Sequence, residues 1–405
     1  MSSLSRRAFL QRAVAGGAAF ASLGGLLAAC EGEGSGGGGA GGGKGAGATS
    51  ARAKTLMLDF HGGRIESPDL FNPYVPGFTG NAGFHQALHE PLFILNYESG
   101  EIEPWLGESF DSNSDGTEWT LKLRDGITWS DGEAYDADDI VFTIKMLIKG
   151  GAELGGAAFQ EWVKSVEKVD KTTAKFTLKK PNPRFQLDYF SVKIWGSTII
   201  VPEHIWSGKD PVKFKNYDPK QGLPLGTGPY KLTSASPTKF TYERRADWWG
   251  AKTGWKPLPK PEKLEFVVSE TEDVRAARAA DNQLDSIADL TGGAFDGLKA
   301  RNKNIISWLP KKPYAWTDPC TRLFSLNNDI EPWNDPQMRW ALNYAIDRDE
   351  IVKIAYEGTT TPARFFFPDY PPMQKYVKML EDAGLFDEYP ILTHDVNKAK
   401  QIIES

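Results

Sequence analysis

The chain has little cysteine and histidine and none of the short motifs that mark common enzymes. Among 405 residues only two are cysteines and five are histidines. Cys30 ends a leader sequence, which leaves Cys320 without a partner for an intrachain disulfide. The sequence contains no HExxH, CxxC, GxSxG or P-loop motif. We therefore predict that the chain is not an enzyme and has no cofactor and no resident metal.

Two histidines could still form a metal site. His85 and His89 have the i,i+4 spacing that can place two metal ligands on one face of a helix. The other histidines, His61, His204 and His394, are dispersed along the chain. We favour ordinary packed or exposed histidines over a metal site.

Positive charge is also scarce in the body of the chain. The formal net charge of −6 becomes about −9 once residues 1–29, which contain three arginines and no acid, are set aside. Binding of nucleic acid requires clustered positive charge, so we expect no nucleic-acid partner.

The N-terminus has the features of an export leader. Arg6 and Arg7 form a twin-arginine motif, which marks the Tat export route, and an apolar Gly/Ala-rich stretch follows. The stretch is too weak for a stable membrane span, which needs about 20 apolar residues. It ends in Leu27-Ala28-Ala29-Cys30, typical of a lipoprotein cleavage site. We predict a signal peptide over residues 1–29, lipidation at Cys30 and a glycine-rich tether over residues 30–53.

The body of the chain alternates between strand and helix patterns, which predicts an α/β fold with antiparallel hairpins. The predicted strands are residues 55–60, 118–124, 127–129, 163–169, 174–178, 199–201, 230–232, 240–242, 263–268 and 323–327. Predicted helices cover 81–91 and begin at Asp136, near Ser269 with Glu272, at Asp335, at Asp347 and at Asp395. The last of these patterns stops at Ser405, and we expect the chain to be truncated there.

Four segments, in this order and spacing, resemble one known family. The first combines His89-Glu90-Pro91-Leu92-Phe93 with Glu103-Pro104-Trp105-Leu106-Gly107-Glu108-Ser109-Phe110. The second runs from Trp119 to Phe142, with Asp125-Gly126 and Asp131-Gly132 as turns. The third is Gly226-Thr227-Gly228-Pro229-Tyr230, followed by Trp248-Trp249-Gly250, and the fourth runs from Asn334 to Ile351. Together they are similar to extracytoplasmic solute-binding proteins of family 5, the peptide/nickel group that serves ABC importers.

The resemblance implies a two-lobed periplasmic-binding-protein type II-like fold with an inserted extra α/β region and an incomplete second lobe. The first lobe would comprise residues 54–84 and 201–310, interrupted by an inserted region over 85–200. The second lobe would begin at 311 and reach 405. Because the acidic residue that pairs with a peptide amino terminus in oligopeptide-binding members lies in the missing part, no peptide anchor is assigned.

Most of the motif residues have structural interpretations. Gly226 and Gly228 are expected to form a tight turn, and Arg339 to pair with an acid or cap carbonyl groups. Candidate ligand contacts are instead aromatic and amide side chains in loops. They are Phe71, Asn72, Tyr74, Tyr314, Trp316, Asn327 and Trp333.

The leader and the resemblance together imply a monomeric lipoprotein receptor outside the cytoplasm, held at the outer face of the cytoplasmic membrane or in the periplasm. It would capture oligopeptides and deliver them to the permease subunits of an ABC importer. An oligosaccharide ligand is the alternative, because family members with sugar ligands exist and 13 tryptophans suit stacking. Nickel binding and a secreted hydrolase are weaker alternatives.

Overall fold

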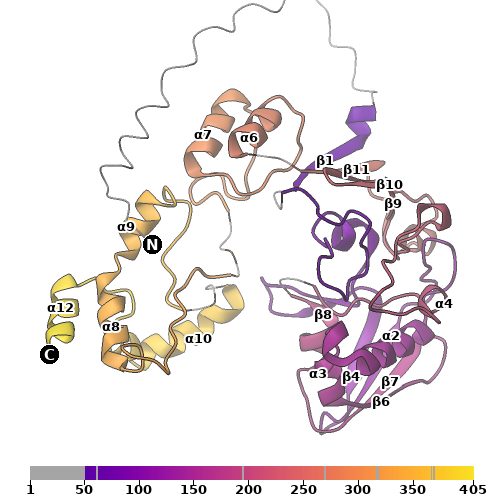
Figure 1. Ribbon diagram of the computed structural model, residues 1–405, viewed down its shortest axis with the longest axis horizontal. Coiled ribbons are helices and arrows are strands. Elements are labelled where there is room, and N and C mark those ends of the chain that lie inside the picture. Colours follow the sequence, from indigo (N-terminus) through magenta and orange to yellow (C-terminus); the bar gives the residue numbers. More distant parts are fainter. Residues whose placement is uncertain are drawn as a thin grey trace, which may run out of the picture. The chain divides into compact units, whose positions relative to one another are not determined.

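Three β-sheets organise the chain as far as Val268, and helices follow (Figure 1). The computed structural model describes residues 51–60, 63–193, 196–268, 271–315, 318, 320–365, 367 and 370–405. The predicted signal peptide, Cys30 and most of the tether lie outside these residues. The tether's last residues, 51–53, belong to a 3₁₀-helix, Ala51–Lys54.

The first sheet joins residues 55–60 to three strands that lie between residues 230 and 268. Its strand order is β1 (Thr55–Phe60), β11 (Lys263–Val268), β10 (Lys239–Arg244) and β9 (Tyr230–Ser236). β1 runs parallel to β11, and the other two pairings are antiparallel. β1 lies in the predicted range 54–84 and the other three strands lie in the range 201–310. The assignment of these ranges to one lobe stays a prediction.

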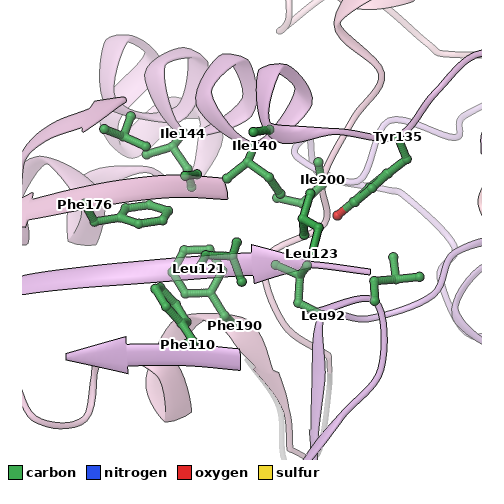
Figure 2. Packing of buried hydrophobic residues seen from close by; sticks show 14 of the residues in the cluster. Leu92, Phe110, Leu121, Leu123, Tyr135, Ile140, Ile144, Phe176, Phe190 and Ile200 are labelled. Atoms are coloured by element: carbon green, nitrogen blue, oxygen red, sulfur yellow. The ribbon is translucent and has the colours of Figure 1, made fainter. Parts of the chain in front are cut away.

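The largest hydrophobic core lies against an antiparallel sheet of β4 (Gly107–Ser112), β5 (Glu118–Leu123), β7 (Thr173–Leu178) and β6 (Val163–Lys168). β5 and β7 alternate between exposed or half-buried and buried residues, as strands with one solvated face should. Helix α2 (Ala137–Gly150) lies over this sheet with Ile140 and Ile144 pointing toward Phe176 and Leu121 (Figure 2). Helix α3 (Ala157–Trp162) contacts α2 and β6.

A small third sheet orders β3 (Ile102–Pro104), β2 (Phe93–Leu95) and β8 (Ser191–Val192). The remaining elements are helices, which are short before Val268 and range from four to twelve residues after it. The short ones are η2 (Phe84–Leu88), η3 (Gly151–Leu154), η4 (Gln186–Phe190), α4 (Glu203–Trp206), η5 (Pro219–Gln221) and α5 (Trp249–Lys252). The later ones are α6 (Glu272–Ala280), α7 (Gly292–Arg301), α8 (Pro336–Ala345), α9 (Arg348–Ile354), α10 (Pro371–Asp382), α11 (Leu385–Glu388) and α12 (Val396–Glu404).

The predicted start of α2 is confirmed, and one acid in it has a second role. Asp136 accepts from the backbone N–H of Asp138, and the Asp139 carboxylate accepts from the N–H of Asp136. The Asp139 carboxylate also accepts from Trp129 Nε1 at 3.0 Å and from the N–H of Glu203 at 2.8 Å. Burial raises the pKa of Asp139 to about 6, against the effect of these hydrogen bonds.

Two of the predicted strands have no strand pairing at all in the structure. Residues 199–201 belong to no strand, and the N–H of Val201 donates instead to the side chain of a helix residue, Thr143 Oγ1, at 3.0 Å. Residues 323–327 have no strand pairing, and the side chains of Leu323 and Phe324 are exposed. An apolar run predicts burial or pairing only where a partner strand is present.

Three further boundaries differ from prediction. Residues 127–129 form only an isolated bridge, Thr128 with Ala134, because the chain turns back at once. The helix expected over 81–91 is the five-residue π-helix η2. α6 is capped by Thr271, whose hydroxyl accepts from the N–H of Val274, while Ser269 lies outside the described residues. The helices predicted from Asp335, Asp347 and Asp395 are confirmed with those residues as N-caps.

Gly226 and Gly228 are required because two backbone segments lie in contact. A β-carbon on Gly226 would lie 2.0 Å from the carbonyl oxygen of Leu88, and one on Gly228 would lie 2.3 Å from that of Ala87. The Gly228 N–H donates to the Leu88 carbonyl at 2.8 Å. Neither glycine has a positive φ, so close approach rather than turn geometry explains them.

Arg245 reinforces the same contact from the other side. Its buried guanidinium donates to the carbonyl oxygens of Gly226 at 3.3 Å, Gly228 at 3.2 Å and Trp129 at 3.1 Å. The Gly-Thr-Gly segment is therefore held between η2 and Arg245.

We expect Gly226→Ala to destabilise the protein by at least about 2 kcal/mol, because the added methyl group meets a backbone oxygen that cannot rotate away. Gly297→Ala is the matched control: it lies inside α7 with nothing within 4 Å of its added carbon. That substitution should be neutral or stabilising by up to about 1 kcal/mol. Urea unfolding followed by circular dichroism measures both, and equal stabilities for the two variants would contradict the packing argument.

Candidate ligand cavity

A cavity of about 780 Å³ lies among segments that are far apart in the sequence. Its wall includes η2 and the residues after it, Trp105 between β3 and β4, Val192 with residues 196–199, and the 256–259 loop. A volume of this size accommodates a short oligomer or a drug-sized ligand. The polar side chains that line it are Asn81, His85, Gln86, His89, Glu90, Ser197, Thr198 and Lys256.

Glu90 is the central polar group of this wall. Its carboxylate accepts from the indole N–H groups of Trp249 at 2.7 Å, Trp105 at 3.2 Å and Trp248 at 3.4 Å. These tryptophans come from two separate segments, before β4 and at the start of α5. A single carboxylate therefore fixes the orientation of three large aromatic side chains.

Burial raises the pKa of Glu90 to about 6, and the hydrogen bonds from the three indoles oppose that rise. Desolvation disfavours the charged carboxylate, while donors that point at it favour the charge. Desolvation is the larger effect here, so Glu90 exchanges a proton near pH 6.

The two histidines of the wall are held neutral by burial. Burial lowers the pKa of His85, and burial together with His85 lowers the pKa of His89 to about 3. His89 ends η2 and packs on the ring of Phe84, with centroids 4.3 Å apart. Within the described residues, no group of three or more His, Cys, Asp or Glu side chains is arranged to hold a metal ion.

A cation borders the aromatic wall. The ammonium group of Lys256 lies 4.2 Å from the ring centre of Trp105 and 4.9 Å from that of Trp255. Trp255 in turn stacks on Trp249, with centroids 4.8 Å apart. The cavity thus combines indole surfaces, one carboxylate and one ammonium group, which suits a ligand with both apolar and polar parts.

The predicted contacts Phe71, Asn72 and Tyr74 lie in the interior packing and are not among the residues that line the cavity. The ring of Phe71 is fully buried and packs on Phe240, with centroids 5.3 Å apart. The Asn72 amide donates to the carbonyl oxygens of Pro211 and Phe214 and accepts from the N–H of Tyr74. The Tyr74 hydroxyl donates to the carbonyl of Ile199. All three side chains have protein partners, so the structure gives them packing roles.

Tyr314, Asn327 and Trp333 are not among the residues that line the cavity. The Tyr314 hydroxyl donates to the Asp296 carboxylate at 2.6 Å, and Asn327 accepts from the N–H of Asp329. Trp333 supplies a carbonyl to Arg339, which confirms the expectation that this arginine caps a carbonyl. Trp316 and Cys30 lie outside the described residues. The assignment of Tyr314, Trp316, Asn327 and Trp333 as ligand contacts, and of Cys30 as the lipidation site, stays a prediction.

Sequence reasoning missed the residues that do line the cavity. Glu90, Trp105 and Trp248 all lie in segments that carry the family resemblance, yet most of those segments received structural interpretations. Their positions along the chain gave no indication that they converge on one carboxylate. The only feature of the sequence that could have predicted this cluster is chemical. A buried acid requires hydrogen-bond donors, and indole N–H groups are donors only.

The fold and the cavity define a solute-binding protein. The chain belongs to the family described as bacterial extracellular solute-binding proteins, family 5, whose middle-region model matches residues 101–405. The predicted fold class, α/β and of the two-lobed periplasmic-binding type, is confirmed by its structural neighbours.

Among curated relatives, the dipeptide-binding protein of Escherichia coli is 26% identical over 378 residues, which cover 88% of this chain and 64% of the relative. The glutathione-binding protein GsiB of Shigella boydii is 27% identical over 299 residues, covering 73% and 54% respectively. The chain therefore spans between about half and two thirds of these relatives' length.

A solved oligopeptide-binding protein of an ABC transporter from Thermotoga maritima is similar in fold, with a TM-score of 0.72 and 29% identity. The match covers 87% of this chain and 62% of that protein. A second structure of the same protein, with mannohexaose bound, gives a TM-score of 0.69 and covers 87% and 61%. Among the residues described for this chain, no helix has both the length and the apolar character needed to cross a membrane.

We expect Glu90→Gln to remove a pH dependence of stability. The folded-state pKa of about 6 lies above the ordinary 4.5, so the folded state binds the proton more tightly and the wild type loses stability as pH rises through this window. The loss is at most about 2 kcal/mol. Glutamine keeps an oxygen acceptor for the indoles but cannot ionise.

Urea unfolding at pH 4.5 and pH 7 measures this effect. The stability of Glu90→Gln relative to wild type should improve from the lower to the higher pH, whereas Glu98→Gln, in an exposed turn, should follow wild type. A parallel pH profile for Glu90→Gln and wild type would show that Glu90 does not titrate in this range.

Proposed function

We propose that the protein is an extracytoplasmic receptor that captures oligopeptides and delivers them to the permease subunits of an ABC importer, with no chemistry of its own. The family match over residues 101–405 is the observation that carries this proposal. Relatives named for dipeptide, glutathione and oligopeptide binding support a peptide ligand.

The cavity supports a peptide through its mixed chemistry. The indole surfaces of Trp105 and Trp248 suit apolar side chains, and the oppositely charged Glu90 and Lys256 suit a ligand that carries both charges. Any ligand that binds more tightly to one arrangement of the protein will also shift its conformational equilibrium toward that arrangement.

An oligosaccharide is the second candidate ligand. The mannohexaose complex of the Thermotoga maritima protein, at 29% identity, favours it. Tryptophan faces also stack on sugar rings, and Trp105 and Trp248 lie in the cavity wall. Nickel has less support: the Campylobacter jejuni neighbour solved in complex with Ni(L-His), at 22% identity, speaks for the fold alone.

A thermal-shift and calorimetry screen discriminates these ligands. We expect peptides of two to five residues to raise the melting temperature, because a ligand at 100 times its dissociation constant stabilises the folded state by about 2.7 kcal/mol. Manno- and cello-oligosaccharides, nickel and free amino acids complete the screen. Lys256→Ala should weaken peptide binding, whereas Lys145→Ala, on α2 and outside the cavity lining, should not. A shift with glycans and none with peptides would overturn the peptide assignment.

The proposed location rests on the leader. Arg6-Arg7, the apolar stretch and Cys30 support export by the Tat route followed by lipid attachment at Cys30. Two or more acyl chains anchor a protein firmly to a membrane, since each buried methylene contributes about 0.8 kcal/mol.

We expect Cys30→Ala to abolish incorporation of radiolabelled palmitate and to release the protein from the membrane fraction. Arg6→Lys with Arg7→Lys should instead retain the unprocessed chain inside the cell, because the twin-arginine route reads both residues. Fractionation and immunoblotting measure both. Membrane retention of Cys30→Ala at the wild-type level would refute the lipid anchor.

A further inference from the structure

Glu357 has an unfavourable backbone conformation for its residue type. Its φ is 52°, in the left-handed region, and the next residue, Gly358, has φ 73°. A left-handed backbone costs free energy for any residue with a β-carbon, and such positions persist where the surrounding contacts compensate. Glutamate is not among the residues that favour this region, so its contacts are informative.

The Glu357 carboxylate binds the first turn of helix α7. Its Oε2 accepts from the backbone N–H of Gly293 at 2.5 Å. The first backbone N–H groups of a helix have no partner within it, and the positive end of the helix dipole favours a carboxylate. Thr291 caps the N–H of Ala294, which leaves Glu357 as the recorded acceptor for Gly293.

Two glycines make room for this carboxylate. A β-carbon on Gly292 would lie 2.9 Å from Glu357 Oε2, and one on Gly293 would lie 3.2 Å from it. Both distances are shorter than an ordinary van der Waals contact, although neither glycine has a positive φ. The pair is therefore explained by the approach of Glu357 rather than by backbone geometry.

A second set of contacts joins the same parts of the chain. Lys312 Nζ donates to the carbonyl oxygen of Glu357 at 2.6 Å and lies 3.9 Å from the Asp296 carboxylate. Tyr314 packs on Phe295 of α7, with ring centroids 4.8 Å apart, and its hydroxyl binds Asp296. Helix α7, the connection at 311–314 and the turn after α9 thus meet at Glu357.

We propose that Glu357 is a latch between the predicted lobes, which it joins by capping α7 across the boundary at residue 311. The latch restricts how far residues 292–301 and 348–358 move relative to each other, and so narrows the range of lobe arrangements. This role requires no ligand and stands whether or not the proposed peptide specificity is correct.

Hydrogen exchange at one amide tests whether the contact forms. In Glu357→Gly the left-handed backbone is retained without strain and the carboxylate is lost, so the Gly293 amide should exchange about two- to fivefold faster. Glu357→Gln, which keeps a neutral acceptor, should lie between this variant and wild type. Glu153→Gln, an exposed glutamate in η3, is the control and should leave the exchange unchanged.

Distance measurement between spin labels tests the latch itself. Labels at Lys164→Cys in β6 and Lys400→Cys in α12, with Cys30 and Cys320 replaced by serine, report on the two predicted lobes. We expect the distance distribution to broaden in Glu357→Gly, with an unchanged melting temperature showing that the fold is kept.

Unchanged Gly293 exchange in Glu357→Gly would overturn the proposal. Faster exchange with an unchanged distance distribution would also overturn it, because Glu357 would then be a local helix cap and no latch. Equal broadening in Glu153→Gln would show that the effect is not specific to the α7 cap.

Discussion

The carboxylate of Glu90 is the constraint on which the cavity depends. It lies where η2 ends and accepts from indoles before β4 and at the start of α5. Without an acceptor at this point, buried indole N–H groups would lose hydrogen bonds, each at a cost of about 1–3 kcal/mol. The carboxylate itself is partly desolvated, so the arrangement is stable only while both sides are present. The Glu90 carboxylate therefore determines both the orientation of the tryptophans in the cavity wall and the negative charge of that wall.

The backbone around Glu90 is held with little tolerance. Gly226 and Gly228 contact the carbonyl oxygens of η2, and Arg245 fixes the same two glycines through their carbonyl groups. η2 and the two residues that follow it place His85, His89 and Glu90 in the cavity wall. The positions of these side chains therefore depend on the backbone contact between η2 and the Gly226–Gly228 segment, which only glycine permits.

Sequence reasoning recovered the parts of this structure that depend on local chemistry. The caps at Asp136, Asp335 and Asp347 and the hairpin strands followed from short-range patterns. Residues 199–201 and 323–327 were misassigned because strand formation depends on a partner elsewhere in the chain. The cavity was missed for the same reason: Glu90 and Trp249 are 159 residues apart, and no local pattern records that they meet. Phe71 and Asn72 follow β1 in a loop, and loop position predicts exposure, whereas both side chains are fully buried.

The long separations in these contacts also have a consequence for how the protein is made. Arg245 and Trp129, which are hydrogen-bonded, are separated by 116 residues in the sequence. β1 pairs with β11, which follows it by more than 200 residues. Contacts of this kind form slowly because long loops must close first. The three indoles can therefore bind Glu90 only after the ribosome has synthesised Trp249. The first sheet can be complete only after Val268 has been synthesised. Until then the nascent chain exposes apolar surface that chaperones would have to shield.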